Sequence, residues 1–166
     1  VDKRREGELS PFGISCALGH VEVARLLLEK GADVNQATEN GQTPLFIACF
    51  NGHVDAARLM LDKGAEVDRA EEHGRTPLVI ACATGHVDAA LLLLERGADV
   101  HHRVNSGHTC MNVACCCGHI AVVQLLLDNG ADPNVADNNG DTPKANAESQ
   151  GHSAIVDLLE KYASDN

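Results

Sequence analysis

Glycine and histidine divide this chain into similar stretches of apolar and polar residues. Apolar runs such as Leu45–Phe50 and Leu59–Leu61 lie between polar stretches that contain glycine, and the whole pattern returns every 33 residues. Three glycine series are in phase: Gly-His pairs that begin at Gly19, Gly52, Gly85, Gly118 and Gly151, a second series at Gly31, Gly64, Gly97 and Gly130, and a third at Gly41, Gly74, Gly107 and Gly140. Such self-similarity predicts an array of structural repeats.

Within each repeat the pattern predicts two short helices. The pair Thr43-Pro44 is typical of a helix start, because threonine caps the first turn and proline has no N–H to satisfy there. A second helix is expected to begin after the Gly-His pair and to end at a left-handed glycine such as Gly64. The apolar positions of the second helix share one helical face: Val54, Ala57, Met60 and Leu61, then Val87, Ala90, Leu93 and Leu94.

Helices this short are marginal in water, since isolated helices need about 12–15 residues to persist. Each pair must therefore bury its apolar face against neighbouring pairs, which distributes stability along a one-dimensional stack. The predicted fold class is all-α, a solenoid of stacked helix-turn-helix units.

The segments Gly41–Leu45 and Leu59–Asp68, with their counterparts one period later, resemble the ankyrin repeat. The resemblance covers about residues 5–166 and implies antiparallel helix pairs with hairpin-like loops projecting at one edge. It places the repeats at 5–37 (degenerate), 38–70, 71–103, 104–136 (rich in Cys and His) and 137–166 (a polar C-terminal cap).

The departures from the family pattern are informative. Where the family has a histidine after Thr-Pro-Leu, this chain has Gly13, Phe46, Val79, Asn112 and Ala145. We expect the hydrogen bonds of that histidine to be absent, with apolar packing in their place at Phe46 and Val79. Glu8 replaces the loop glycine of the first repeat, which also carries the apolar Ile14 and Leu18. The missing initiator Met favours an excised piece of a longer protein over a processed product, and the apolar Ile14 and Leu18 favour a further repeat upstream.

Four of the seven cysteines follow the period: Cys16, Cys49, Cys82 and Cys115. Equivalent positions on neighbouring helices lie about 8–10 Å apart, whereas a disulfide needs Cα atoms within about 7 Å. We therefore expect buried free thiols. Unpaired cysteines favour a reducing compartment, and we predict a cytoplasmic location.

The fourth repeat concentrates possible metal ligands: His101, His102, His108, Cys110 and Cys115–Cys117. Thiolates and imidazoles bind zinc, but consecutive helical residues point about 100° apart, so at most two of the three adjacent cysteines can share one ion. The preferred interpretation of this segment is that its residues lie in a groove that tolerates such small side chains, and that no metal binds. Cys116 and Cys117 are expected to be the exposed, reactive thiols.

Catalytic chemistry is not predicted. The Gly-His histidines recur once in every repeat, so we expect each ring to bond backbone between repeats. The sequence contains no nucleophile elbow, phosphate-binding loop, dinucleotide fingerprint or zinc-protease motif. The chain is therefore expected to be no enzyme and to need no cofactor.

One modification site follows from the family resemblance. The stretch from Leu27 to Asn35 is similar to sites that a cytosolic asparaginyl hydroxylase modifies in ankyrin domains, with Asn35 as the target. The alternative, which we prefer, is that asparagine suits the geometry of the loop.

The resemblance also implies a binding surface. In ankyrin proteins partners contact the concave face, which comprises the loop tips and the exposed ends of the first helices. The matching residues here are Glu39, Asn40, Gln42, Phe50, Asn51, Glu72, His73, Arg75, Ala83, Thr84, Asn105, Ser106, His108, Cys116 and Cys117. An exposed aromatic such as Phe50 is either an interface anchor or packs on the helix of the next repeat.

Charge narrows the choice of partner. The formal net charge is -11, so nucleic acid and anionic membranes would be repelled, whereas a protein with a basic patch would be attracted. No apolar run is long enough to span a membrane. The leading prediction is a monomeric protein-binding module; the alternative is a structural spacer without a dedicated partner.

Overall fold

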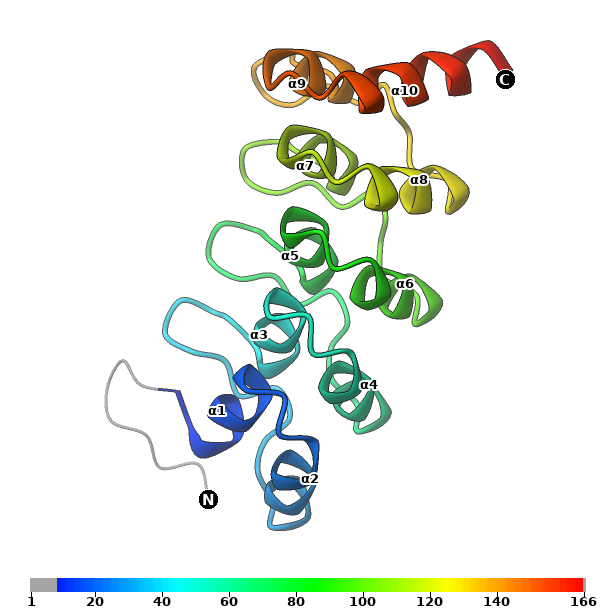
Figure 1. Cartoon of the computed structure of the whole chain (residues 1–166). Coiled ribbons are helices and arrows are strands. Elements are labelled where there is room, and N and C mark those ends of the chain that lie inside the picture. The colour runs from blue at the N-terminus through cyan, green and yellow to red at the C-terminus, as the bar shows by residue number, and fades with distance from the viewer. Residues whose placement is uncertain (1–8, 166) are drawn as a thin grey trace.

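The computed structural model describes residues 9–165, and this part of the chain forms ten helices and no strand (Figure 1). The helices alternate between the first and second member of a pair. They are α1 (Pro11–Ala17), α2 (Val21–Glu29), α3 (Pro44–Phe50), α4 (Val54–Asp62), α5 (Pro77–Thr84), α6 (Val87–Glu95), α7 (Cys110–Cys117), α8 (Ile120–Asp128), α9 (Pro143–Ser149) and α10 (Ser153–Asp165). The predicted all-α class is confirmed.

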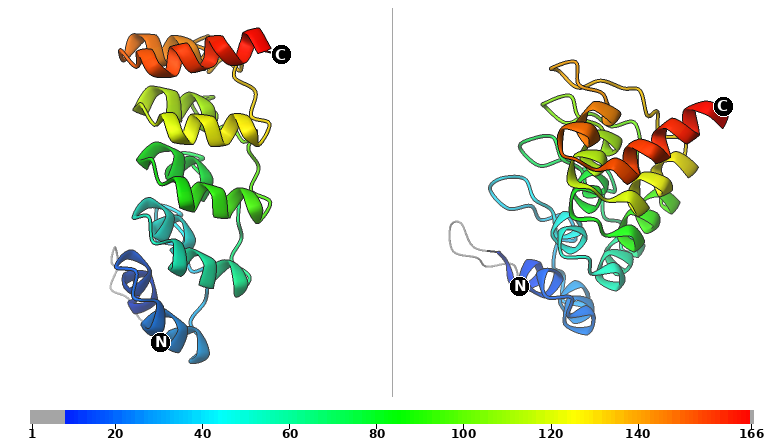
Figure 2. Two further views of the ribbon diagram at one scale, coloured as in Figure 1. Left: turned by 45° about the vertical axis from the view of Figure 1, so that its right-hand side comes forward. Right: turned by 45° about the horizontal axis from the view of Figure 1, so that its top comes forward.

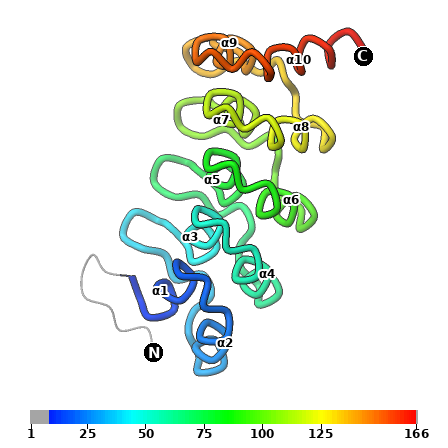
Figure 3. Tube along the Cα trace, in the orientation of Figure 1, coloured from blue at the N-terminus to red at the C-terminus, as the bar shows by residue number. Residues whose placement is uncertain are grey.

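The helix pairs form layers that stack from α1–α2 at one end to α9–α10 at the other (Figure 2). First helices pack on first helices and second helices on second helices, and each helix also packs on its own partner. The long loops that precede α3, α5, α7 and α9 project together beyond the first helices (Figure 3). The layered solenoid predicted from the 33-residue period is therefore present. Glu8, and the outermost parts of the predicted first and last repeats, lie outside the described residues.

The first helices begin as the sequence predicts. The hydroxyls of Thr43 and Thr76 accept hydrogen bonds from the backbone N–H groups of Phe46 and Val79, and proline follows each threonine. Ser10 caps α1 in the same way, so Ser10-Pro11-Phe12, which stands where the other repeats have Thr-Pro-Leu, still starts a helix. Each such cap stabilises a helix by about 1 kcal/mol.

The core between the layers is mainly aliphatic and contains the four periodic cysteines, Cys16, Cys49, Cys82 and Cys115, as fully buried free thiols. The predicted apolar stripe of α4 is confirmed at Ala57 and Met60, whereas Val54 and Leu61 are only partly buried. Ala56 and Leu59 are buried instead. The buried face is wider than one stripe because α4 packs both on α3 and on the neighbouring second helices.

Four of the five Gly-His histidines tie neighbouring repeats together, as expected; His20, in the first repeat, makes no such contact within residues 9–165. The Nε2 atom of His119 lies 3.0 Å from the carbonyl oxygen of Ala83, in the repeat before. The same contact recurs in three other repeats, from His53 to Ala17 at 3.0 Å, from His86 to Phe50 at 3.2 Å and from His152 to Cys116 at 3.1 Å. A carbonyl only accepts, so each ring donates its Nε2 proton.

One expectation about the residues that replace the family histidine is wrong. Phe46 and Val79 are buried and apolar, as predicted, but Asn112 at the same position of the fourth repeat restores polar contacts. Its side chain bonds Thr109, Val135 and Asp141. Because Asn112 is fully buried, its amide must find partners within the protein, and the loop before α9 supplies two carbonyls.

Candidate partner-binding surface

The projecting loops are braced both internally and against each other. Each closes with a backbone hydrogen bond, for example from the Glu71 N–H to the Arg75 carbonyl at 3.1 Å. Backbone bonds also join the tip of one loop to the next: Glu72 N to Asn40 O (3.0 Å), Asn105 N to His73 O (3.1 Å) and Asn138 N to Ser106 O (3.2 Å). The loop tips therefore form a continuous ladder along one edge of the stack.

A hollow of about 630 Å³ lies where the first two layers meet the first projecting loop. Phe50, half exposed, lies at the hollow, and Phe46 and Ile47 contribute apolar surface beneath it. Five of the residues predicted to bind a partner line it together: Glu39, Asn40, Gln42, Phe50 and Asn51. The remaining lining residues are Leu9, Ala17 and Thr38. The sequence did not predict Leu9 or the hollow itself.

The other predicted residues lie farther along the stack. The Thr84 hydroxyl donates to the carbonyl of Ile80 at 2.8 Å and so faces its own helix. Ala83 is half-buried, as is Cys116, while Cys117 is exposed. None of these residues lines the hollow beside Phe50.

The second projecting loop is held by a buried acid that sequence reasoning missed. The carboxylate of Glu71, 1% exposed, accepts hydrogen bonds from the N–H groups of His73 and Arg75 and from the Arg75 guanidinium at 3.0 Å. Burial raises the pKa of Glu71, but the contacts with Arg75 outweigh it and hold the pKa below its ordinary value. Arg75 also lies 5.9 Å over the ring of Phe46. Its side chain thus already has partners within the protein.

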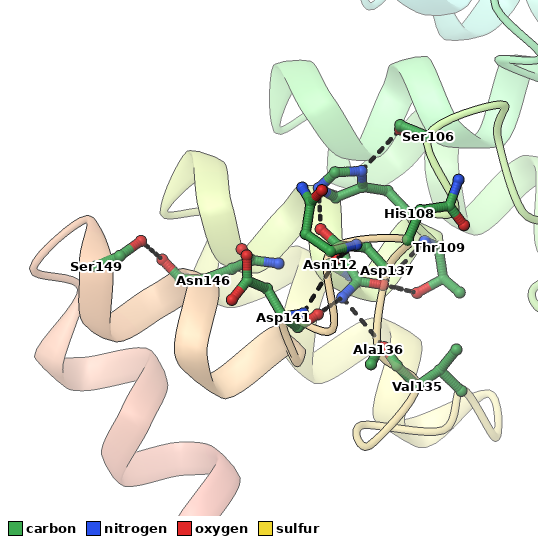
Figure 4. A network of polar contacts seen from close by, with 12 residues as sticks. Ser106, His108, Thr109, Asn112, Val135, Ala136, Asp137, Asp141, Asn146 and Ser149 are labelled. Carbon is green, nitrogen blue, oxygen red and sulfur yellow. Dashed lines mark hydrogen bonds and ion pairs between the residues drawn. The ribbon is translucent and has the colours of Figure 1, made fainter.

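An equivalent acid holds the last loop, two periods later. Asp137 accepts from the N–H groups of Asn139 and Asp141 and lies 3.1 Å from Nε2 of His108 (Figure 4). The Ser106 hydroxyl oxygen lies 2.8 Å from Nδ1 of the same histidine. Serine, histidine and aspartate thus follow one another as in a hydrolase triad. The carboxylate, however, repeats the loop-closing contacts of Glu71, which accounts for it without catalysis.

Acidification should weaken this last loop. Burial raises the pKa of Asp137, but the N–H groups of Asp141 and Asn139 and the His108 ring outweigh it and lower the pKa. A carboxyl with a lowered folded-state pKa contributes fully above its unfolded value of about 3.9, and that contribution is lost as pH falls through the folded value. We expect Asp137→Asn to lower the urea midpoint at pH 7, and the gap from the unmodified chain to close below about pH 4.

Urea unfolding at several pH values, followed by circular dichroism, measures this gap. The control is Asp157→Asn, a change at an exposed carboxylate on α10. A gap for Asp137→Asn that stays constant from pH 7 to pH 2 would show that the charge of Asp137 does not stabilise the loop.

Possible metal ligands do not assemble in the fourth repeat. Within residues 9–165, three donor atoms come within 4.8 Å of one another only at Glu71, Glu72 and His73. The Glu71 carboxylate there is already bonded by two N–H groups and a guanidinium, so it is poorly placed to bind an ion. Cys116 and Cys117 belong to no such group in the described part of the chain.

The exposed thiol Cys117 and three buried thiols share the direction of their pKa shifts. Burial raises the pKa of Cys16, Cys49 and Cys115 to about 12. Burial and the neighbouring Cys116 also raise the pKa of Cys117, the exposed thiol. The thiolate is the reactive form, so the exposure of Cys117 is as expected while its pKa shift works against reactivity.

Asn35 links the first two repeats. Its side-chain oxygen accepts from the Glu66 N–H at 3.0 Å, and its amide nitrogen lies 3.4 Å from the Gly64 carbonyl oxygen. This geometry supports the preferred reading of Asn35 as a loop residue; its hydroxylation stays a prediction.

The architecture defines a class: a solenoid of stacked helix pairs whose projecting loops form one edge. Comparison with families of known proteins gives the same answer. Residues 12–104 match ankyrin repeats (3 copies), and residues 93–143 match ankyrin repeats (many copies). The chain belongs to the ankyrin repeat family. A search of curated proteins gives no match. Ankyrin repeats are generally protein–protein interaction modules rather than enzymes.

Proposed function

We propose that this chain binds a protein partner on its concave face, formed by the first helices and the loop tips. The observation that carries the proposal is the hollow beside Phe50. Phe50 is 50% exposed, and a half-exposed aromatic next to an apolar hollow has the character of an interface anchor. Polar residues of the first loop surround it, as the rim of an interface would.

The loop tips extend this surface along the stack. Glu72, His73, Asn105 and Ser106 are exposed, and His108 is partly exposed. The backbone bonds between the tips support a rigid surface, which lowers the entropy lost on binding. Ala83, Thr84, Cys116 and Cys117 continue the face at the ends of α5 and α7.

The chemistry of the chain favours a basic protein surface as the partner. The net charge of -11 attracts a basic patch and opposes nucleic acid or an anionic membrane. Within residues 9–165, no helix is long and apolar enough to cross a membrane. Seven free thiols fit a reducing, cytoplasmic setting, and we propose a monomer. The alternative remains a spacer that positions other domains and has no partner of its own.

A pull-down from cell lysate tests the proposal. The variant Phe50→Glu/Ala83→Arg places charge on the concave face, and we expect it to lose most of the partner that the unmodified chain captures. The control Leu91→Glu changes a 40% exposed leucine on the second helix α6 and should capture normally. Circular dichroism confirms that all three are folded. Equal capture by the two variants would place binding elsewhere, and no capture by any chain would favour the spacer.

A further inference from the structure

The first repeat exposes apolar side chains at positions that the second and third repeats keep buried. Ile14, Val23 and Leu26 are 47%, 48% and 57% exposed. Their equivalents in the next two repeats are at most 8% exposed: Ile47, Ala56 and Leu59, then Ile80, Ala89 and Leu92. The three exposed residues define the end face of the stack. Large apolar side chains gathered on one surface are typical of an interaction site.

The repeats themselves show what covers these positions. Ile155 is equivalent to Val23 and is only 2% exposed, although within residues 9–165 no layer follows α10. Its cover comes from its own layer or the layer before it, and since Val23 stays exposed beside its own layer and the next one, the layer before must supply the cover. Ala24, by contrast, is 0% exposed in the first described layer, so its cover comes from its own layer or the next one. In α2, Val23 thus faces the side where a preceding layer would lie.

We propose that the end face is the docking surface of a further ankyrin-type repeat. That repeat would pack on α1 and α2 as these helices pack on α3 and α4 (Figure 1). The interface continues the established one, since it uses the three positions that are buried in the second and third layers, and Val122 at one of them is also buried in the fourth. Repeat arrays gain stability from such nearest-neighbour interfaces.

The opposite end of the stack has the reverse character and excludes a head-to-tail copy as the occupant. Lys144, Glu148 and Glu160 stand one period after Met111, Cys115 and Leu127, which are core residues. The Lys144 ammonium lies 2.7 Å from Glu160 and 3.7 Å from Glu148. Covering Ile14, Val23 and Leu26 with this end would bury three charges, which is costly. A repeat of the internal type fits instead, because the side that it would turn toward α1 and α2 is apolar.

The experiment adds such a repeat. A copy of residues 71–103 is joined directly before residue 5, which keeps the 33-residue period. This unit is chosen because in the stack it lies directly before the repeat that contains Val122. Val122 is the equivalent of Val23, has the same side chain and is 0% exposed. We expect the extended chain to unfold in one transition with a higher urea midpoint. In the extended chain, Val23→Glu/Leu26→Glu should cancel this increase in the urea midpoint. In the unextended chain, the same two substitutions should change the midpoint little.

The matched control is Leu91→Glu/Ile120→Glu, since these residues are 40% and 44% exposed on other second helices. It should leave the increase intact. A separate transition for the added unit, or an unchanged midpoint, would overturn the proposal. So would sedimentation of the unextended chain as a dimer that Val23→Glu/Leu26→Glu converts to monomer, because a second copy would then occupy the face. None of these outcomes bears on binding at the concave face.

Discussion

Replacing Gly85 with alanine is expected to lower the free energy of unfolding by about 1.5–3.5 kcal/mol. Gly85 ends α5 with a left-handed φ of 76°, which costs an L side chain about 1–2 kcal/mol. A Cβ atom there would also lie only 2.6 Å from Nδ1 of His119. The ring must move, and its hydrogen bond to the Ala83 carbonyl, contributing about 0.5–1.5 kcal/mol, is then lost.

Gly97→Ala separates the two effects. Gly97 has a similar φ of 84°, but an added Cβ would meet no atom within 4 Å. Only the backbone cost remains, so we expect a loss of about 1–2 kcal/mol. Urea unfolding of both variants, followed by circular dichroism, measures the difference. Equal losses would show that the Gly-His contact between repeats contributes nothing to stability.

Much of the fold could be predicted because its determinants are local. Proline at the first helical position and a capping threonine fix the start of a helix wherever they occur, and a left-handed glycine fixes its end. The period then places Cys49 and Cys82 in the core without knowledge of any contact. What the local pattern could not give was the width of the buried face of α4, because Ala56 and Leu59 are buried by other layers.

The candidate surface was harder to predict. The sequence placed Phe50 on the concave face through its position in the repeat, but the hollow depends on how two layers and a loop meet. Glu71 and Asp137 were missed for a related reason. They share one position of the repeat with Thr38 and Val104, so no residue type recurs there. The common role of Thr38, Glu71 and Asp137 is visible only in the structure, where a side-chain oxygen of each accepts the backbone N–H that closes its loop.

Asn112→Val is expected to lower the free energy of unfolding by about 2–4 kcal/mol, although valine occupies the equivalent position in the third repeat. The Asn112 side-chain oxygen accepts from the Thr109 N–H at 2.9 Å, and its amide nitrogen lies 3.2 Å from the Val135 carbonyl oxygen and 3.4 Å from that of Asp141 (Figure 4). Valine leaves the Thr109 N–H and the Val135 carbonyl unpaired, while the Asp141 carbonyl still accepts from the Asp137 N–H. Each unpaired buried group costs about 1–3 kcal/mol, and the Val135 carbonyl, which is only partly buried, lies toward the lower end of that range. Because the two carbonyls belong to the loop before α9, hydrogen exchange should accelerate most in α9 and α10.

Asn146→Ala provides the control in the neighbouring repeat. The amide nitrogen of Asn146 is buried and has no hydrogen-bond partner in the described part of the chain. Removing it ends that penalty, so we expect little loss of stability or a small gain, with normal exchange in α9 and α10. A loss as large as that of Asn112→Val would mean that any buried asparagine in this region is needed for packing. The contrast between the two variants therefore tests whether the bonds of Asn112, rather than its volume, hold the last repeat to the stack.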